Sequence, residues 1–228
     1  MAKRRGRQIS RRKPKRTIVL VVEGETELYY FTGLGQYLRS LDSDGSRPAI
    51  KKHHAGGVSP EHVVKTARIL FETYGEPASD VHYIAVFDTE YPDLEKRKSF
   101  DRAVKKAKEL GISVVASHPC FEVWMHCHLP KFSPCAFLDA KDCVSQLDRE
   151  WKSKRICTEG YAKAKIDVFT RVQDQLPQAV ECAKILRETH HRTVEHTADA
   201  NASTDVYRLV EYLQGAIEEY SPFIGEGG

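Results

Sequence analysis

Short apolar segments alternate with longer amphipathic ones along the first half of the chain. The apolar segments are residues 17–22, 49–54, 81–88 and 112–117. The first and third are almost unbroken runs of aliphatic and aromatic residues, which is typical of strands buried on both faces of a sheet. Between the apolar segments, apolar residues recur at helical spacing in residues 26–41, 59–74 and 93–110. This alternation predicts a parallel sheet with right-handed crossovers and helices on both of its faces.

The second half of the chain has mostly helical periodicity. The expected helices are residues 120–129, 139–152, 161–176, 178–189 and 204–220, the last of them capped by Ser203 or Thr204. We therefore expect an α/β fold, a parallel sheet flanked by helices, with a helical C-terminal portion. Its parts would be a disordered basic tail (1–16), an α/β core (17–130) and a helical extension that packs on the core (131–228).

Acidic residues stand where two of the predicted core strands end. Glu23 directly follows the first strand, and Asp88 is the last residue of the third. Because parallel strands end at the same edge of a sheet, where open sheets bind ligands, we expect the two side chains to meet there. Glu25, Glu27 and Glu90 are close in sequence. Crowded carboxylates repel one another, and oxygen ligands without clustered Cys or His favour Mg²⁺ or Mn²⁺ as the neutralising cation.

These acids also have a purely structural interpretation. Glu27 falls in the first turn of an expected helix, where the helix dipole favours a negative charge. Acids are also common in the loops that follow strands. Two core strands that each end in an acid, one of them followed by Gly24 and a second acid, favour the metal site over this interpretation.

Positive charge is concentrated at the start of the chain. Nine of the 35 Lys and Arg residues lie in residues 1–16, which contain no acid. The other 26 face 32 Asp and Glu, so residues 17–228 carry a net charge of −6 within an overall charge of +3. Such a tail can neutralise nucleic-acid phosphates without reading sequence, and it can equally act as a solubilising arm or dock on an acidic partner. The candidate nucleic-acid contacts are Arg4, Arg5, Arg11, Arg12 and Lys13.

Cysteine usage and hydropathy indicate a cytoplasmic protein. The six cysteines contain no CxxC pair, and we interpret them as reduced thiols, with a zinc site at Cys120, Cys127 and nearby histidines as the alternative. A membrane-spanning helix needs about 18 consecutive apolar residues, and the sequence contains no such run. The basic start is not followed by the apolar h-region of a signal peptide, because the apolar run after it is short and ends at Glu23, so we expect no secretory signal.

Two motifs resemble the Toprim fold, the catalytic domain shared by topoisomerases, primases and OLD-type nucleases. They are Val-Glu-Gly-Glu-Thr-Glu at 22–27 and Phe-Asp-Thr-Glu at 87–90, similar to the fold's Glu-Gly after one strand and DxD after another. Residues 23–31, 117–128 and 201–209 are similar to the RloB-like family, a bacterial branch of Toprim proteins linked to phage defence and restriction-type loci. The second is similar to that family's S-N-P-x-F-E-x-W…H stretch, and the third is similar to its N-P-S-T-x-V-x-x-L-V ending.

The resemblance implies roles for particular acids. Glu23 would be the catalytic or metal-binding glutamate, Asp88 the leading metal aspartate, and Glu122 a further acidic ligand. Three positions depart from the family pattern: Glu90, His118 and Ala202 stand where the second Asp of DxD, an Asn and a Pro are expected. Glu90 keeps the negative charge but reaches farther than aspartate, which changes the geometry available to a metal.

Several polar residues near these acids are candidate substrate contacts. Glu122 and His126 share a face of the expected helix at i, i+4, so His126 would orient Glu122 or contact phosphate, unless it is a core or surface histidine. Lys163 and Lys165 are candidates for phosphate contact on their charge alone, and a solvated helix face is the alternative. Glu27 completes this set of candidates.

The sequence leads to two main functional hypotheses. The first is an Mg²⁺-dependent endonuclease of DNA or RNA, with metal on Glu23, Asp88, Glu90 and Glu122 and with Glu23 as a general acid or base. The second is a non-catalytic nucleic-acid-binding or regulatory subunit, partnered with the AAA- or ABC-type ATPase that the resemblance implies. A third, topoisomerase-like strand transfer, would need a nucleophilic tyrosine from another domain. No base-reading motif separates DNA from RNA.

Overall fold

The computed structural model describes most of the chain between residues 16 and 215. The described ranges are 16–43, 45, 47–56, 59–89, 93–130, 136–165, 167–191 and 201–215. Glu90, Cys135 and the predicted tail contacts Arg4, Arg5, Arg11, Arg12 and Lys13 lie outside the described residues.

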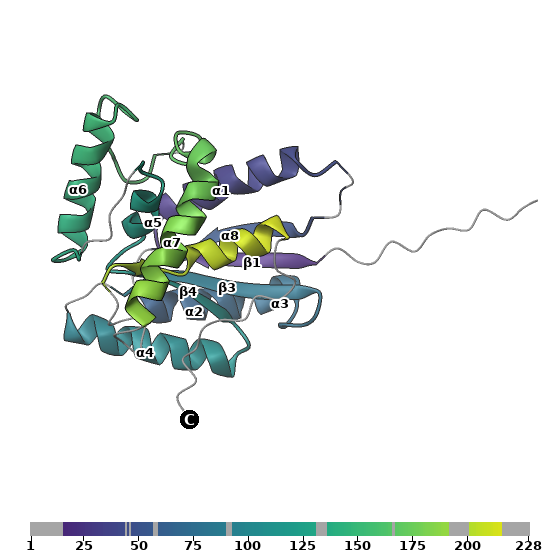
Figure 1. The fold of residues 1–228 in the computed structure, drawn as a ribbon. Helices are drawn as coiled ribbons and strands as arrows, with labels where there is room; N and C mark the ends of the chain where they lie inside the picture. The colour runs from purple at the N-terminus through teal and green to yellow at the C-terminus, as the bar shows by residue number, and fades with distance from the viewer. Residues whose placement is uncertain are drawn as a thin grey trace, which may run out of the picture.

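A five-stranded sheet with the order β2-β1-β3-β4-β5 forms the centre of the fold (Figure 1). Its strands are β1 (Thr17–Val22), β2 (Ala49–His54), β3 (Val81–Asp88), β4 (Ser113–His118) and β5 (Ser203–Thr204). The first four are parallel, and β5 pairs antiparallel with β4 at the edge. Val22 of β1 is in register with Val86 of β3, so these strands end at the same edge. The predicted α/β fold class is confirmed.

Helices cover both faces of the sheet because alternate strand residues face opposite ways. Ile18, Leu20 and Val22 share one core with α1 (Glu25–Ser40), α5 (Glu122–Cys127) and the later helices. Val19 and Val21 share the other with α2 (Pro60–Ile69), α3 (Phe71–Tyr74) and α4 (Leu94–Glu109). Residues 18–22 are all fully buried, as the unbroken apolar run of a central strand requires.

The C-terminal part contributes a strand as well as helices. Its helices are α6 (Ala140–Ser153), the 3₁₀ turn η1 (Gln173–Gln175), α7 (Leu176–His191) and α8 (Val206–Gln214). The apolar faces of α6, α7 and α8 join the same core as α1, so the predicted extension and the predicted core share one hydrophobic cluster. Residues 203–204, predicted as a helix cap, instead form β5, and α8 begins two residues later.

The prediction of a helix at 161–176 is wrong. The described residues of this range form turns that lead into η1. The next predicted helix, 178–189, is confirmed as α7. Ala164 has φ +57°, a left-handed conformation that an α-helix does not contain. Its N–H donates to Thr26 Oγ1 at 3.0 Å instead of to a helical carbonyl. A contact with a distant element therefore overrides the local periodicity.

Two glycines of α1 are expected to respond oppositely to alanine. A Cβ at Gly33 would lie 2.7 Å from Phe169 Cβ, whereas one at Gly35 meets only Lys52 Nζ at 3.5 Å and Ile50 Cδ1 at 3.9 Å. Gly35→Ala should raise the free energy of unfolding by about 0.5–1 kcal/mol through helix propensity. Gly33→Ala should lower it by about 1–2 kcal/mol, because overpacking outweighs that gain. Urea unfolding of both variants checks this, and equal shifts would contradict the close packing of residue 169 on α1.

In the described part of the chain, no helix is both long and apolar enough to cross a membrane. The described cysteines are all free; Cys120, Cys127 and Cys143 are buried, and Cys157 and Cys182 are partly exposed. This agrees with the interpretation of these five residues as reduced thiols.

Candidate active site

The carboxyl edge of the sheet gathers four acidic side chains, each from a different element of the fold. Glu23 follows β1, Asp88 ends β3, Glu27 lies in the first turn of α1 and Glu122 begins α5. The backbone N–H of Asp88 donates to Glu23 Oε2 at 3.2 Å. The acids that the sequence places on separate strands therefore lie next to one another in space.

Burial and mutual repulsion act on these carboxyls. Asp88 keeps some solvent exposure, but the protein atoms around its carboxyl desolvate it. That desolvation, followed by repulsion from Glu27, Glu23 and Glu122, raises the pKa of Asp88 well above its usual range. Burial, together with Glu122 and Glu23, raises the pKa of Glu27 to about 7. Two acids of the cluster therefore hold protons far more readily than free carboxyls do.

Glycine at position 24 makes room for the Glu27 carboxylate. Gly24 is the residue before α1, with an extended backbone that any residue adopts. A Cβ there would lie 2.6 Å from Glu27 Oε2 and 3.3 Å from Oε1. Because Gly24 has no side chain, the Glu27 carboxylate can occupy the space next to residue 24.

Glu122 is the most deeply buried acid of the cluster, with 1 % of its surface exposed. The Tyr161 hydroxyl donates to Glu122 Oε1 at 2.9 Å, and Lys163 Nζ lies 3.3 Å from the same oxygen. Glu122 Oε2 is buried and has no hydrogen-bond partner among the described residues. A buried carboxylate oxygen without a partner is costly, so this oxygen is available to accept a hydrogen bond or to bind a cation.

Lys163 reaches the cluster from the turns at 161–165. Burial opposes its charge, but attraction by Glu122, Cys120 and Asp88 outweighs burial and raises the pKa of Lys163. Four acids and this lysine leave an excess of negative charge at the edge of the sheet. Such an excess is neutralised by protons, as at Glu27, or by a bound cation.

Tyr161 and Thr26 are site residues that the sequence analysis did not identify. Tyr161 holds the Glu122 carboxylate, and Thr26 holds the turn that carries Lys163 through the Ala164 N–H. Residues 26 and 164 are 138 positions apart, and no local pattern links them. The positive charge of Lys163 was the only feature of the sequence that pointed to residues 161–165 as part of the site.

Other predicted site residues lie elsewhere. His126 Nε2 donates to the Cys143 carbonyl at 3.0 Å, and its ring packs on Phe137, so it is a core histidine directed toward α6. The reason is that α5 is buried on every side, and its residues face different neighbours. Lys165 is exposed and has no contact with the acids among the described residues. His118 hydrogen-bonds the hydroxyl of Thr89, the residue after Asp88.

The donor chemistry of the cluster fits a hard cation, although the side chains are not closed around one. Among the described ranges, no group of three or more His, Cys, Asp or Glu is arranged to hold a metal ion. Carboxylate oxygens in excess over positive charge, with one buried oxygen of Glu122 unpartnered, are the ligand set that Mg²⁺ and Mn²⁺ prefer. Binding would require the carboxylates to turn toward a common centre.

Comparison with known proteins gives one match. A family model described as "RloB-like protein" matches residues 18–213, most of the chain. No curated protein and no solved structure matches the chain.

Proposed function

The chain belongs to the RloB-like protein family, and on that premise we propose that it is an Mg²⁺- or Mn²⁺-dependent nuclease. The observation that carries the proposal is the group of four acids at the carboxyl edge of the sheet, whose negative charge Lys163 offsets only in part. Buried like charges destabilise a fold unless something neutralises them, and residues kept at that cost are typical of functional sites. Phage defence and partnership with an ATPase belong to the proposal as its biological setting.

Each residue of the cluster receives a role in phosphodiester cleavage. Glu23, Asp88 and Glu122 would hold the ion, and Glu90, which lies outside the described residues, is the further ligand that the sequence predicts. The ion, when bound, supplies positive charge to the phosphate and favours ionisation of water. Lys163 offers a second positive charge to a non-bridging phosphate oxygen. Glu27, with a pKa of about 7, can accept or donate a proton near neutral pH.

A cleavage assay tests the proposal. The full chain is incubated with DNA, RNA and tRNA in Mg²⁺, in Mn²⁺ and in EDTA, and products are followed on denaturing gels. The proposal predicts cutting of at least one substrate with either metal and none in EDTA. Cutting that persists in EDTA, or no cutting of any substrate, would contradict it.

A non-catalytic nucleic-acid-binding subunit is the second candidate. Lys163 and Tyr161 already occupy one oxygen of Glu122, which partly neutralises the cluster without a metal. That arrangement favours a structural role for the acids over a catalytic one. Nucleic-acid binding without cleavage in the same assay would support this candidate over the first.

Gly24→Ala is expected to separate catalysis from folding. The new Cβ would displace the flexible end of Glu27, so the free energy of unfolding should change by less than about 1 kcal/mol. Misplacing a reacting group by about 1 Å can lower a rate about a hundredfold, and we expect a loss of that order. Because the effect acts through Glu27, adding Gly24→Ala to a Glu27→Gln variant should lower the cleavage rate little further. A parent-like rate would show that this carboxylate has no part in the reaction.

A further inference from the structure

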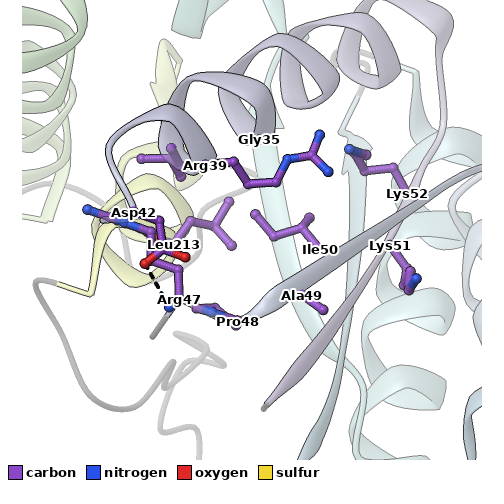
Figure 2. A pocket seen from close by; sticks show the side chains of 11 residues that line it. Gly35, Arg39, Asp42, Arg47, Pro48, Ala49, Ile50, Lys51, Lys52 and Leu213 are labelled. Carbon is purple, nitrogen blue, oxygen red and sulfur yellow. Dashed lines mark hydrogen bonds between the residues drawn. The ribbon is translucent and has the colours of Figure 1, made fainter. Parts of the chain in front are cut away.

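A cavity lies at the opposite end of α1 from the acids. It is a cavity of about 200 Å³ between the last turns of α1, the first half of β2 and the loop that joins them, with Leu213 of α8 behind it (Figure 2). Its walls combine apolar residues, Leu38, Ile50 and Leu213, with basic ones. The acids occupy the opposite end of the same helix, so the two sites are distinct.

Two cations face each other in this cavity. Figure 2 shows the side chains of Arg39, from α1, and Lys52, from β2, directed toward one another above Ile50. Gly35 has no side chain to separate them, and a Cβ there would lie 3.5 Å from Lys52 Nζ. Neither Arg39 nor Lys52 forms an ion pair with another described residue. Burial, then repulsion from Arg39 and Lys51, lowers the pKa of Lys52.

Arg47 also lines the cavity, but its hydrogen-bond donors are already used by other groups of the protein. Its Nη1 donates to the carbonyls of Gln214 at 3.0 Å and Leu213 at 3.5 Å, and its backbone N–H donates to Asp42 Oδ1 at 3.4 Å. These contacts fix the joining loop against α8. They leave Arg39 and Lys52 as basic groups available to a ligand.

We infer that this cavity binds a phosphate group, held between the Arg39 guanidinium and the Lys52 ammonium. Facing cations repel each other, and an anion between them turns that repulsion into two charge-assisted hydrogen bonds. Pockets for drug-sized ligands span about 300–1,000 Å³. The smaller volume here suits a phosphate or diphosphate group more than a whole nucleotide. The phosphate would come from a free nucleotide or from a nucleic-acid backbone.

Binding measurements in EDTA test this inference without involving the acidic site. Pyrophosphate, a nucleoside triphosphate and a single-stranded oligonucleotide are titrated by calorimetry into the full chain and into two variants, Lys52→Met and Arg39→Gln. Each variant should bind at least about tenfold more weakly, because each loses a charge-assisted hydrogen bond. Lys65→Met, which removes the same charge from an exposed site on α2, is the control and should bind like the parent.

The three ligands distinguish the sources of the phosphate. A loss for the nucleoside triphosphate and pyrophosphate alone assigns the site to free nucleotides, and a loss for the oligonucleotide assigns it to a nucleic-acid backbone. Parent-like binding by Lys52→Met and Arg39→Gln, an equal loss in Lys65→Met, or no binding of any ligand to the parent would overturn the inference. Thermal melting of each variant verifies that it is folded. None of these outcomes depends on whether the chain cleaves nucleic acid.

Discussion

Asp88→Asn is expected to lower Mg²⁺-dependent cleavage by about a thousandfold, because losing a ligand carboxylate weakens binding of the ion that would stabilise charge in the transition state. The amide has nearly the shape of the carboxyl but no negative charge for a cation. The backbone N–H of residue 88 that donates to Glu23 is unchanged, so the neighbouring acid stays in place. The substitution also removes a desolvated like charge, so the melting temperature should stay the same or rise.

The control for this prediction is Asp101→Asn, the same change at an exposed position of α4. It should cleave like the parent. Initial rates measured at saturating substrate over a range of Mg²⁺ concentrations show whether Asp88→Asn acts through the metal. A variant that cuts as fast as the parent at every Mg²⁺ concentration would remove Asp88 from the proposed mechanism.

Glu27→Gln is expected to stabilise the metal-free protein by about 3 kcal/mol at pH 8, because a pKa raised from 4.5 to about 7 costs that much once the group ionises. Below pH 4.5 the Glu27 carboxyl is protonated in both the folded and the unfolded state, so it does not lower the free energy of unfolding. Between pH 4.5 and 7 only the folded state holds it, so the stability of the parent falls as pH rises. For a chain of this length the variant should melt about 5–10 °C higher at pH 8.

This stability effect has a matched control in the same helical turn. Glu25 is exposed, whereas Glu27 is 5 % exposed, so Glu25→Gln should change stability little at any pH. Mg²⁺ should stabilise the parent more at pH 8 than at pH 5.5, because it competes with the proton for the same carboxylates. Equal melting temperatures for parent and Glu27→Gln at pH 8 would show that the buried carboxyl is not under strain.

The sequence predicts the centre of the fold because its signals there are local and agree with one another. The apolar runs that end at Glu23 and Asp88 are long enough to be buried strands, and parallel pairing then brings the two acids to one edge. Gly24 could be recognised as part of a motif. Its spatial role, to leave room for Glu27, required coordinates.

The parts that the sequence did not predict depend on contacts between distant elements. The turn at Ala164 is held by Thr26, and Tyr161 reaches Glu122 across 39 positions, so neither follows from periodicity. A two-residue strand such as β5 has no periodic pattern to detect. His126 has helical spacing to Glu122, but helical spacing does not determine which neighbour a residue meets when the whole helix is buried.

The central claim is that the acids of this edge hold a divalent cation, and a crystal structure of the protein with Mn²⁺ tests it most directly. Anomalous difference density distinguishes Mn²⁺ from water and places it relative to the side chains. The account predicts a peak bounded by carboxylate oxygens of Glu23, Asp88 and Glu122, with the buried Glu122 Oε2 turned toward it. Crystals grown in saturating Mn²⁺ that show no peak there, with Lys163 still bound to Glu122, would contradict the account.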